Sequence, residues 1–191
     1  FVQDSGEAEF QIEKVDFHEN FNVGPYLNND IAIAHIRQDE GGIKFGPYVG
    51  PVCLPSPHTT YAGKNVTISG WGKNGYDQDL NGKNFISKLQ YASVPVIPSG
   101  VCRQDNVYGG EKISSGMFCA GLLEGGVDSC QGDSGGPAVL LEETVGGADR
   151  GVVVGLTSWG YGCGRQFKPG VYTRLSKYVP WIYEKIKQLH V

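Results

Sequence analysis

The sequence predicts an all-β fold that ends in one α-helix, and three observations support this. Short segments rich in Val, Ile, Thr and Tyr recur between clusters of Gly, Pro and Asn, which is typical of β-strands separated by turns. The 29 glycines are spread along the chain without a repeat period, as in barrels and sandwiches. Near the C-terminus, apolar residues recur at intervals of three and four, which is the period of a helix.

We expect strands at residues 65–70, 89–97, 151–159 and 170–175, where β-branched and aromatic residues are concentrated. A helix is expected over residues 179–190. Val179, Ile182, Ile186 and Leu189 would lie on one face of it. Pro180 is compatible with the start of that helix, because the first helical turn does not use the N–H that proline lacks.

Composition and charge exclude several classes of partner. With 191 residues, 40% of them hydrophobic, the chain can fill a globular core. The net charge is −4 and the charged residues of both signs are interspersed, so no basic stripe favours nucleic acid or an anionic membrane surface. No apolar run approaches the roughly 20 residues that span a bilayer. We therefore expect no nucleic-acid partner and no membrane partner.

The cysteines bear on the cellular compartment. The chain has five cysteines, at positions Cys53, Cys102, Cys119, Cys130 and Cys163. None of them forms a CxxC pair that would suggest zinc or a redox site, so disulfides are the better interpretation. Disulfides form in oxidising compartments, and the sequon Asn65-Val66-Thr67 is compatible with glycosylation of Asn65 there. We expect a secreted, extracellular protein without a metal site.

The most informative segment is residues 128–137, which read DSCQGDSGGP. Glycines beside a nucleophile let the backbone turn sharply and let a substrate carbonyl approach main-chain N–H groups. Such groups stabilise the oxyanion that develops when a serine attacks. Ser134 is therefore the expected nucleophile. The alternative for Gly132 to Pro137, taken alone, is a surface turn.

Five further segments, in the right order, give nearly the whole chain a resemblance to the trypsin-like serine peptidases. They are NNDIA at 28–32, ISGWG at 68–72, MFCAG at 117–121, SWG at 158–160 and KPGVYT at 168–173. The resemblance implies a trypsin-like double β-barrel with a C-terminal α-helix, in a peptidase domain over 1–191 that lacks its N-terminal part. We expect residues 1–70 to be the remainder of an incomplete first barrel, 71–178 the second barrel, and 179–190 the helix.

The resemblance also implies roles for individual residues. Ser134 would be the nucleophile, Asp30 would orient the catalytic histidine, and the N–H groups of Gly132 and Ser134 would form the oxyanion hole. Asp133 corresponds to the aspartate that pairs with the new N-terminal ammonium when a zymogen is cleaved. Without the downstream motifs, Asp30 would be read as a turn residue, because it follows two asparagines.

Specificity follows from Asp128, which precedes Ser134 by six residues and corresponds to the carboxylate at the bottom of the primary pocket. A buried carboxylate needs a cation, and Gly160 and Gly170 correspond to pocket walls that leave room for a long side chain. Cleavage after Arg or Lys is therefore expected. The alternative for Asp128 is a solvated turn charge. The expected substrate-binding residues are Asp128, Ser129, Gln131, Ser158, Trp159, Gly160, Gly162 and Gly170.

One member of the triad has no counterpart in the sequence. In the family the histidine precedes the aspartate within a Thr-Ala-Ala-His-Cys motif, and the chain contains no such motif. None of His18, His35, His58 and His190 fits as the general base. We expect the histidine on an upstream segment, together with the mature N-terminus, and we expect this chain alone to be inactive.

The family's disulfide pattern would join Cys102 to Cys119 and Cys130 to Cys163, which leaves Cys53 for a light chain or another missing segment. Such a link favours a regulated cascade protease that is activated from a zymogen. Further partners implied by the resemblance are protein substrates with Arg or Lys at the cleavage site, and serpin-type or other protease inhibitors. No cofactor is expected, although a calcium site near Asp4 and Glu7 stays open.

Two other functions compete with the enzyme. The first is a non-catalytic serine-protease homologue that acts as a binding or cofactor module after losing its histidine. The second is a structural β-sandwich or lectin-like binding domain. The enzyme is favoured because Asp30, Gly132 and Ser134 are all present, and because a binding domain would not require acidic residues at fixed spacing before the serine.

Overall fold

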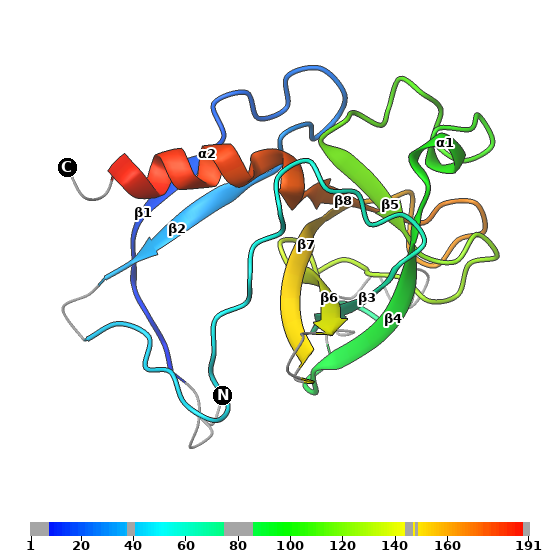
Figure 1. The fold of residues 1–191 in the computed structure, drawn as a ribbon. Helices are drawn as coiled ribbons and strands as arrows, with labels where there is room; N and C mark the ends of the chain where they lie inside the picture. The colour runs from blue at the N-terminus through cyan, green and yellow to red at the C-terminus, as the bar shows by residue number, and fades with distance from the viewer. Residues whose placement is uncertain (1–7, 38–40, 75–85, 144–146, 148, 189–191) are drawn as a thin grey trace.

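A computed structural model describes residues 8–37, 41–74, 86–143, 147 and 149–188. In this part of the chain a two-stranded sheet and a closed six-stranded barrel are followed by a long C-terminal helix, α2 (Figure 1). The two-stranded sheet pairs β1 (Ile12–Phe17) with β2 (Ala32–Ile36) in antiparallel fashion. The expected fold class, all-β with an incomplete first barrel and a C-terminal helix, is confirmed.

The barrel is built from six antiparallel strands in the order β3-β4-β5-β8-β7-β6. The strands are β3 (Asn65–Gly70), β4 (Gln90–Ile97), β5 (Met117–Ala120), β6 (Pro137–Glu143), β7 (Asp149–Trp159) and β8 (Gly170–Arg174). A single-turn helix, α1 (Ser99–Cys102), follows β4. Because side chains of a strand alternate between faces, every second residue of β3 and β4 fills the core. These residues are Val66, Ile68, Val94 and Val96.

The barrel begins earlier than the sequence suggested. β3 pairs with β4 and also with β6, so it closes the barrel rather than belonging to the first unit. The boundary between the two units therefore lies before Asn65, and not at residue 71. The physical reason is that Val66 and Ile68 are almost completely buried in the core that β6 and β7 complete.

α2 (Leu175–Lys187) also begins earlier than expected, at Leu175 instead of residue 179. Pro180 lies inside this helix, where it cannot donate the hydrogen bond that the carbonyl of Ser176 would receive. The structure supplies another donor, because the N–H of His58 donates to that carbonyl at 3.0 Å. The Ser176 hydroxyl in turn donates to the carbonyl of Thr59 at 2.7 Å. The 58–59 segment thus satisfies the helix at the point where proline interrupts it.

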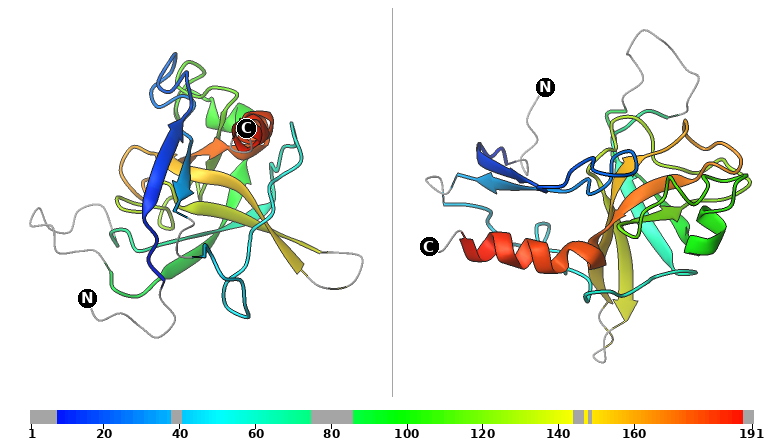
Figure 2. Two further views of the ribbon diagram at one scale, coloured as in Figure 1. Left: turned by 90° about the vertical axis from the view of Figure 1, so that its left-hand side faces the viewer. Right: turned by 90° about the horizontal axis from the view of Figure 1, so that it is seen from above.

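α2 leaves the barrel and runs beside the two-stranded sheet, as two perpendicular views show (Figure 2). A shared apolar cluster joins the helix to the barrel and to the residue before β2, and its buried members are Ile31, Val153, Leu175, Tyr178 and Ile182. The Tyr178 hydroxyl donates to Asn29 Oδ1 at 3.0 Å, and the Trp181 indole N–H donates to Glu19 Oε2 at 2.8 Å. None of the described helices has the length and apolarity needed to cross a membrane.

Candidate active site

The loop between β5 and β6 carries Ser134 and is tied down by its own backbone. Gly132 and Gly135 have φ of +96° and +79°, in the left-handed region that favours glycine. The N–H of Asp133 donates to Cys130 O at 3.0 Å, and the N–H of Gly135 donates to Thr157 O of β7 at 2.9 Å. Ser134 itself is exposed at the top of this turn. The loop therefore presents a hydroxyl to solvent on a fixed backbone.

Two amides of the loop take no part in its backbone hydrogen bonding. Among the described residues, the N–H groups of Gly132 and Ser134 donate none of the backbone–backbone hydrogen bonds, although the amides of Asp133 and Gly135 do. The carbonyl of Gln131 accepts a hydrogen bond from Lys73 N at 2.8 Å. In a trans peptide the N–H points away from the carbonyl, so this bond directs the Gly132 N–H away from Lys73. Both amides are thus available to an oxyanion.

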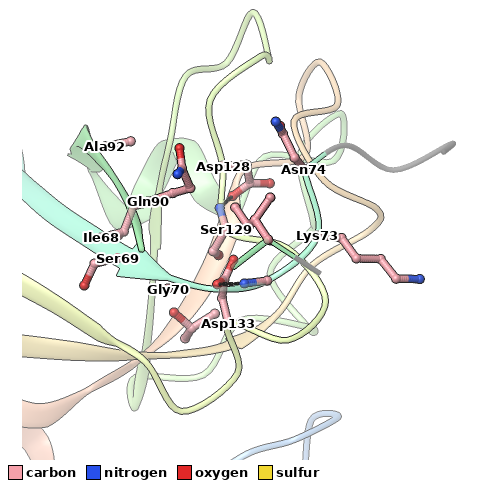
Figure 3. A pocket seen from close by; sticks show the side chains of 13 residues that line it. Ile68, Ser69, Gly70, Lys73, Asn74, Gln90, Ala92, Asp128, Ser129 and Asp133 are labelled. Carbon is pink, nitrogen blue, oxygen red and sulfur yellow. Dashed lines mark hydrogen bonds between the residues drawn. The ribbon is translucent and has the colours of Figure 1, made fainter. Parts of the chain in front are cut away.

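The Asp133 carboxylate lies on the other side of the loop, against the end of β3 (Figure 3). It accepts hydrogen bonds from Gly72 N at 2.8 Å and from Cys130 N at 2.9 Å. A Cβ added at Gly70 would lie 1.9 Å from Asp133 Oδ1, so glycine is required there. The carboxylate also borders a cavity of about 130 Å³ that reaches Asp128 and Ser129. Asp133 therefore fixes the nucleophile loop against the end of β3.

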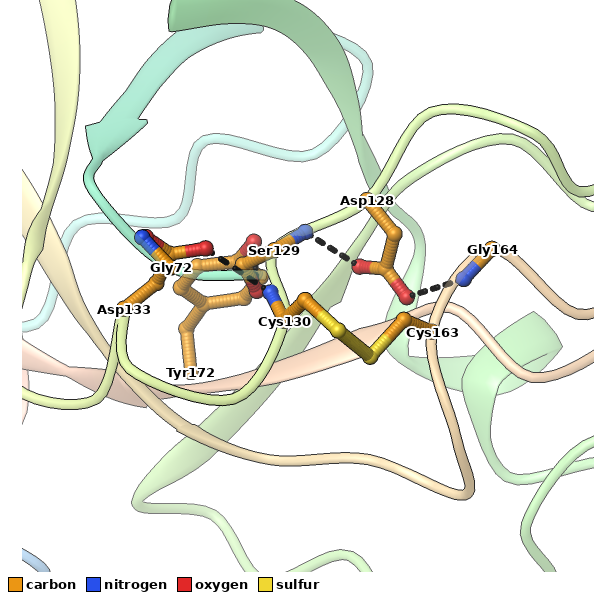
Figure 4. The surroundings of a disulfide bond; sticks show 8 residues. All are labelled: Gly72, Asp128, Ser129, Cys130, Asp133, Cys163, Gly164 and Tyr172. Carbon is orange, nitrogen blue, oxygen red and sulfur yellow. Dashed lines mark hydrogen bonds between the residues drawn. A yellow bond between two sulfur atoms is a disulfide. The ribbon is translucent and has the colours of Figure 1, made fainter. Parts of the chain in front are cut away.

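Asp128 is the other acidic residue of the loop, and it lies beside the Cys130–Cys163 disulfide (Figure 4). It accepts hydrogen bonds from Ser129 N at 2.9 Å and from Gly164 N at 3.0 Å. Burial raises the pKa of this carboxyl to about 6, against the lowering effect of the backbone donors. A Cβ on Gly170 would lie 2.7 Å from Asp128 Oδ1, so a side chain there would displace the carboxylate.

One cavity, of about 350 Å³, joins the nucleophile loop to Asp128. Ser134 lines it, as do all eight residues that the sequence predicted for substrate binding: Asp128, Ser129, Gln131, Ser158, Trp159, Gly160, Gly162 and Gly170. Sequence reasoning did not single out three further lining residues, Tyr26, Leu27 and Thr157. Tyr26 and Leu27 come from the loop between β1 and β2, and no local motif marks them.

The Asp30 carboxylate is connected to this cavity through Ser158. The Ser158 hydroxyl donates to Asp30 Oδ2 at 2.6 Å, and the Thr173 hydroxyl donates to the Asp30 carbonyl at 2.6 Å. Asp30 thus belongs to the loop of the two-stranded sheet but is held by strands β7 and β8 of the barrel. Asp30 and Gly135, the residue after Ser134, are thus held by the neighbouring β7 residues Ser158 and Thr157, although 104 residues separate Asp30 from Ser134 in sequence.

Aromatic side chains cluster around Trp159, which is one of the residues that line the cavity. The rings of Tyr26, Tyr108 and Tyr161 lie at centroid distances of 6.2, 5.0 and 5.8 Å from the Trp159 ring. The Trp159 indole N–H is buried and has no hydrogen-bond partner within the described part of the chain. Trp159 and Tyr26 line the cavity, whereas Tyr108 and Tyr161 contact Trp159 without lining it.

A comparison with protein families shows to which family the chain belongs. The family model described as Trypsin matches residues 1–182 of the chain. The chain belongs to the trypsin family. Among curated relatives, trypsin-1 of Astacus astacus is 40% identical over 181 residues, which cover 95% of this chain and 69% of the relative. Coagulation factor XII of Cavia porcellus is 42% identical over 170 residues, covering 86% and 27%. The hepatocyte growth factor activator serine protease of Canis lupus familiaris is 38% identical over 180 residues, covering 93% and 26%.

The described histidines of this trypsin-family chain lie outside the cavity. His18 packs against the rings of Tyr178 and Trp181, and His35 Nε2 lies 2.7 Å from Asp16 Oδ2. His58 lines a different cavity near the start of α2, and His190 is outside the described residues. None of the three described histidines lines the cavity that contains Ser134.

The disulfides of the trypsin-family chain are those that the resemblance implied. Cys102 is joined to Cys119, and Cys130 is joined to Cys163. Cys53 is exposed and forms no disulfide within the chain. Asn65, the sequon residue, is exposed at the first position of β3. Asp4 and Glu7, named for a calcium site, lie outside the described residues.

Proposed function

We propose that the chain is the nucleophile-bearing part of a secreted trypsin-like serine endopeptidase that cleaves after Arg or Lys. The observation that carries this proposal is the position of Asp128, whose carboxylate lines the same 350 Å³ cavity as Ser134. A carboxylate in a confined cavity binds a cation far better than a neutral side chain. An Arg or Lys side chain of the substrate would pair with Asp128 and so place the next carbonyl at Ser134.

The proposed chemistry uses groups of this chain for every role except that of the general base. The Ser134 hydroxyl would attack the carbonyl, and the amides of Gly132 and Ser134 would donate to the oxyanion. Asp30 would hold a histidine, supplied by a segment outside this chain, in the tautomer that accepts the serine proton. The acyl-enzyme would then be hydrolysed by water with the same histidine as the base.

Activation from a zymogen is part of the proposal. An N-terminal ammonium would enter the 130 Å³ cavity beside Asp133 and pair with its carboxylate. Because Asp133 lies between Gly132 and Ser134 in sequence, fixing its side chain also fixes the two amides of the oxyanion hole. Support for this role comes from the close fit of the carboxylate against Gly70 and Gly72, which leaves it little freedom to turn elsewhere.

Cys53 is proposed to link this chain to a light chain or another upstream segment. Its backbone is fixed to the barrel, since the Cys53 N–H donates to Gly151 O and the Val153 N–H donates to Cys53 O, both at 3.0 Å. The thiol itself is exposed, so it can form a bond outside the chain. The matched part is only 27% of factor XII, so that relative has much additional chain. Serpin-type inhibitors would be recognised at the same cavity as substrates.

A second candidate function is a non-catalytic homologue that binds proteins without cleaving them. The observation that favours it is that no described histidine lines the cavity of Ser134. The two candidates differ in a single measurable property, which is turnover by the chain when it is joined to its natural upstream segment.

The test assays the protein with its upstream segment, after activation, on fluorogenic peptides that end in Arg, Lys, Phe or Leu. We expect cleavage after Arg and Lys only, a loss of about 10⁶-fold in kcat for Ser134→Ala, and a loss of the preference for Asp128→Ser. Equal cleavage after Phe and Leu would refute the pocket assignment. Absence of turnover in the completed protein would favour the non-catalytic homologue.

The chain of 191 residues alone is expected to show no turnover on the same peptides. Non-reducing peptide mapping of the native protein is expected to find Cys53 bonded to a segment outside this chain. A free Cys53 in the native protein would rule out the light-chain proposal and leave the catalytic one untouched.

A further inference from the structure

A second cavity lies beside the start of α2, away from the nucleophile, and has a volume of about 340 Å³. It is formed by four segments that disulfide and hydrogen bonds fix in place: the 58–60 segment, α1 with Arg103 after it, the 114–115 turn before β5, and residues 174–177 at the end of β8 and the start of α2. Its lining residues are His58, Thr60, Ser99, Arg103, Ser114, Ser115, Arg174, Ser176 and Lys177. It shares no lining residue with the cavity of Ser134.

The charges around this cavity are all positive. Arg103, Arg174 and Lys177 line it, and no carboxylate does. Within the described part of the chain, none of the three forms a salt bridge. Burial lowers the pKa of the Arg174 guanidinium, and the nearby charge of Arg103 lowers it further. Three cations close together without a counter-charge repel each other, so an anion between them would be stabilised.

Arg174 is held in place by contacts that leave its charge uncompensated. Its Nη2 donates to Met117 O at 2.8 Å and to Ser99 Oγ at 3.3 Å, and the guanidinium lies over the Phe118 ring at 5.6 Å. Neutral oxygens and an aromatic face position the guanidinium without neutralising it. Arg174 is therefore a fixed, partly buried cation of the cavity, whereas Arg103 and Lys177 are exposed.

The remaining lining groups are hydrogen-bond donors of the kind that oxyanions accept. Four hydroxyl residues, Thr60, Ser99, Ser114 and Ser115, face the cavity together with the cations. α2 has no side-chain cap at its N-terminus, and its first turn contains no acidic residue. The positive end of the helix dipole therefore adds to the field of the three side chains instead of being offset.

We propose that this cavity is a binding site for a single tetrahedral oxyanion, the sulfate or phosphate group of a free ion or of a small molecule that carries one. Three cations of different reach, with hydroxyl donors between them, suit the three or four oxygens of such a group. The site is one cluster rather than a stripe, so it fits one group and not a long polyanion.

The test measures the binding of inorganic sulfate to the whole chain by isothermal titration calorimetry, at constant ionic strength with chloride as the balancing anion. Saturable binding is expected for the native chain. The variant Arg103→Gln with Lys177→Gln removes two exposed charges, and we expect it to bind sulfate about tenfold more weakly. Arg174 is left unchanged because its loss would also remove contacts that hold β5.

The matched control is Lys44→Gln with Lys187→Gln, which changes the net charge equally at two exposed lysines outside the cavity. This control is expected to bind sulfate as the native chain does. Glucosamine 6-sulfate is titrated in parallel: tighter binding than sulfate would assign the group to a sugar, and equal binding to the free ion. Equal sulfate affinity in all three proteins, or no saturable binding by the native chain, would overturn the proposal.

Discussion

At the residue scale, Asp128 is a carboxyl group whose charged form the fold destabilises by burial and a bound cation would stabilise. Three backbone N–H groups, of Ser129, Gly164 and Gly170, donate to its carboxylate, yet burial outweighs them and the pKa is raised to about 6. The charged form is thus costly at neutral pH in the absence of a cation. A bound cation would reduce that cost, and this reduction would contribute to the free energy of cation binding.

The first prediction follows from this pKa. Below about pH 6 the carboxyl is mostly protonated and neutral, so it no longer attracts a cation. We expect the affinity of the chain for benzamidine to be constant above pH 7 and to fall about tenfold per pH unit below pH 6. Calorimetric titration from pH 5 to pH 8 measures this directly.

The variant Asp128→Ser should lose benzamidine binding and with it the pH dependence. Asp149→Ser is the matched control, because Asp149 is an exposed acid at the start of β7 that does not line the cavity. An affinity that stays constant down to pH 5 in the native chain would contradict the assignment of Asp128 as the cation's partner.

At the element scale, α2 is more than a C-terminal cap, since it connects the barrel to the loop that carries Asp30. Tyr178 reaches from the helix to Asn29, whose φ of +56° is unusual for a residue other than glycine. Further along the helix, Trp181 and Lys185 both bind Glu19. These contacts lower the pKa of the Glu19 carboxyl to about 2, mainly through the hydrogen bond with Lys185. The helix thus holds the segment that precedes Asp30, at Glu19 and at Asn29.

The second prediction concerns this connection. Tyr178→Phe removes the hydroxyl that donates to Asn29 and leaves the buried ring in place, so it should lower the free energy of unfolding by about 1 kcal/mol. Tyr183→Phe, at an exposed position of the same helix, should change it by less than about 0.5 kcal/mol. Urea denaturation of both variants compares the two effects. Equal stability of the two variants would show that the contact with Asn29 contributes nothing.

At the scale of the whole molecule, the barrel and the two-stranded sheet differ in how well they are supported. Every barrel strand has two neighbours and an inner face in the core. Among the described residues β1 pairs only with β2, and its apolar residues Ile12, Val15 and Phe17 are exposed. A two-stranded sheet is only marginally stable by itself in water. The sheet therefore depends on α2 and on the cluster around Ile31.

The third prediction is a difference in local stability. The amides of β1 and β2 should exchange with deuterium at least about tenfold faster than those of β3 and β5, because they can open without unfolding the barrel. Hydrogen exchange followed by mass spectrometry resolves the two groups of peptides. Adding the upstream segment that we propose should slow the exchange of β1. Uniform protection across both units would mean that the chain unfolds only as one body.

Much of the site could be predicted because its key residues are close in sequence. Asp128, Asp133 and Ser134 lie in one loop, where the flanking glycines mark Ser134 and the resemblance implies the roles of the two aspartates. Asp30 needed the resemblance, since an aspartate after two asparagines has no distinctive local pattern. Tyr26, Leu27 and Thr157 were missed because only the folded chain brings the β1–β2 loop to the cavity.

The elements of the fold could also be predicted where their signal is local, and not where they depend on residues remote in sequence. The strands at 65–70 and 90–97 were expected within one residue of their bounds, because β-branched residues and flanking turns mark them. β5 has only four residues, all buried, and β6 begins with a proline, so neither has a strand pattern of its own. The start of α2 was misplaced because the partner that makes Pro180 tolerable, His58, is remote in sequence.

The aromatic cluster around Trp159 also gives the protein an intrinsic fluorescent probe beside the cavity of Ser134. Trp159 has an N–H without a partner and lies within about 6 Å of three tyrosine rings, close enough for efficient energy transfer to the indole. A ligand that displaces water from the part of the cavity beside Trp159 would shift the emission of Trp159 to shorter wavelength. Occupancy of the cavity could then be followed by fluorescence in the unlabelled chain, with Trp159→Phe as the silent reference.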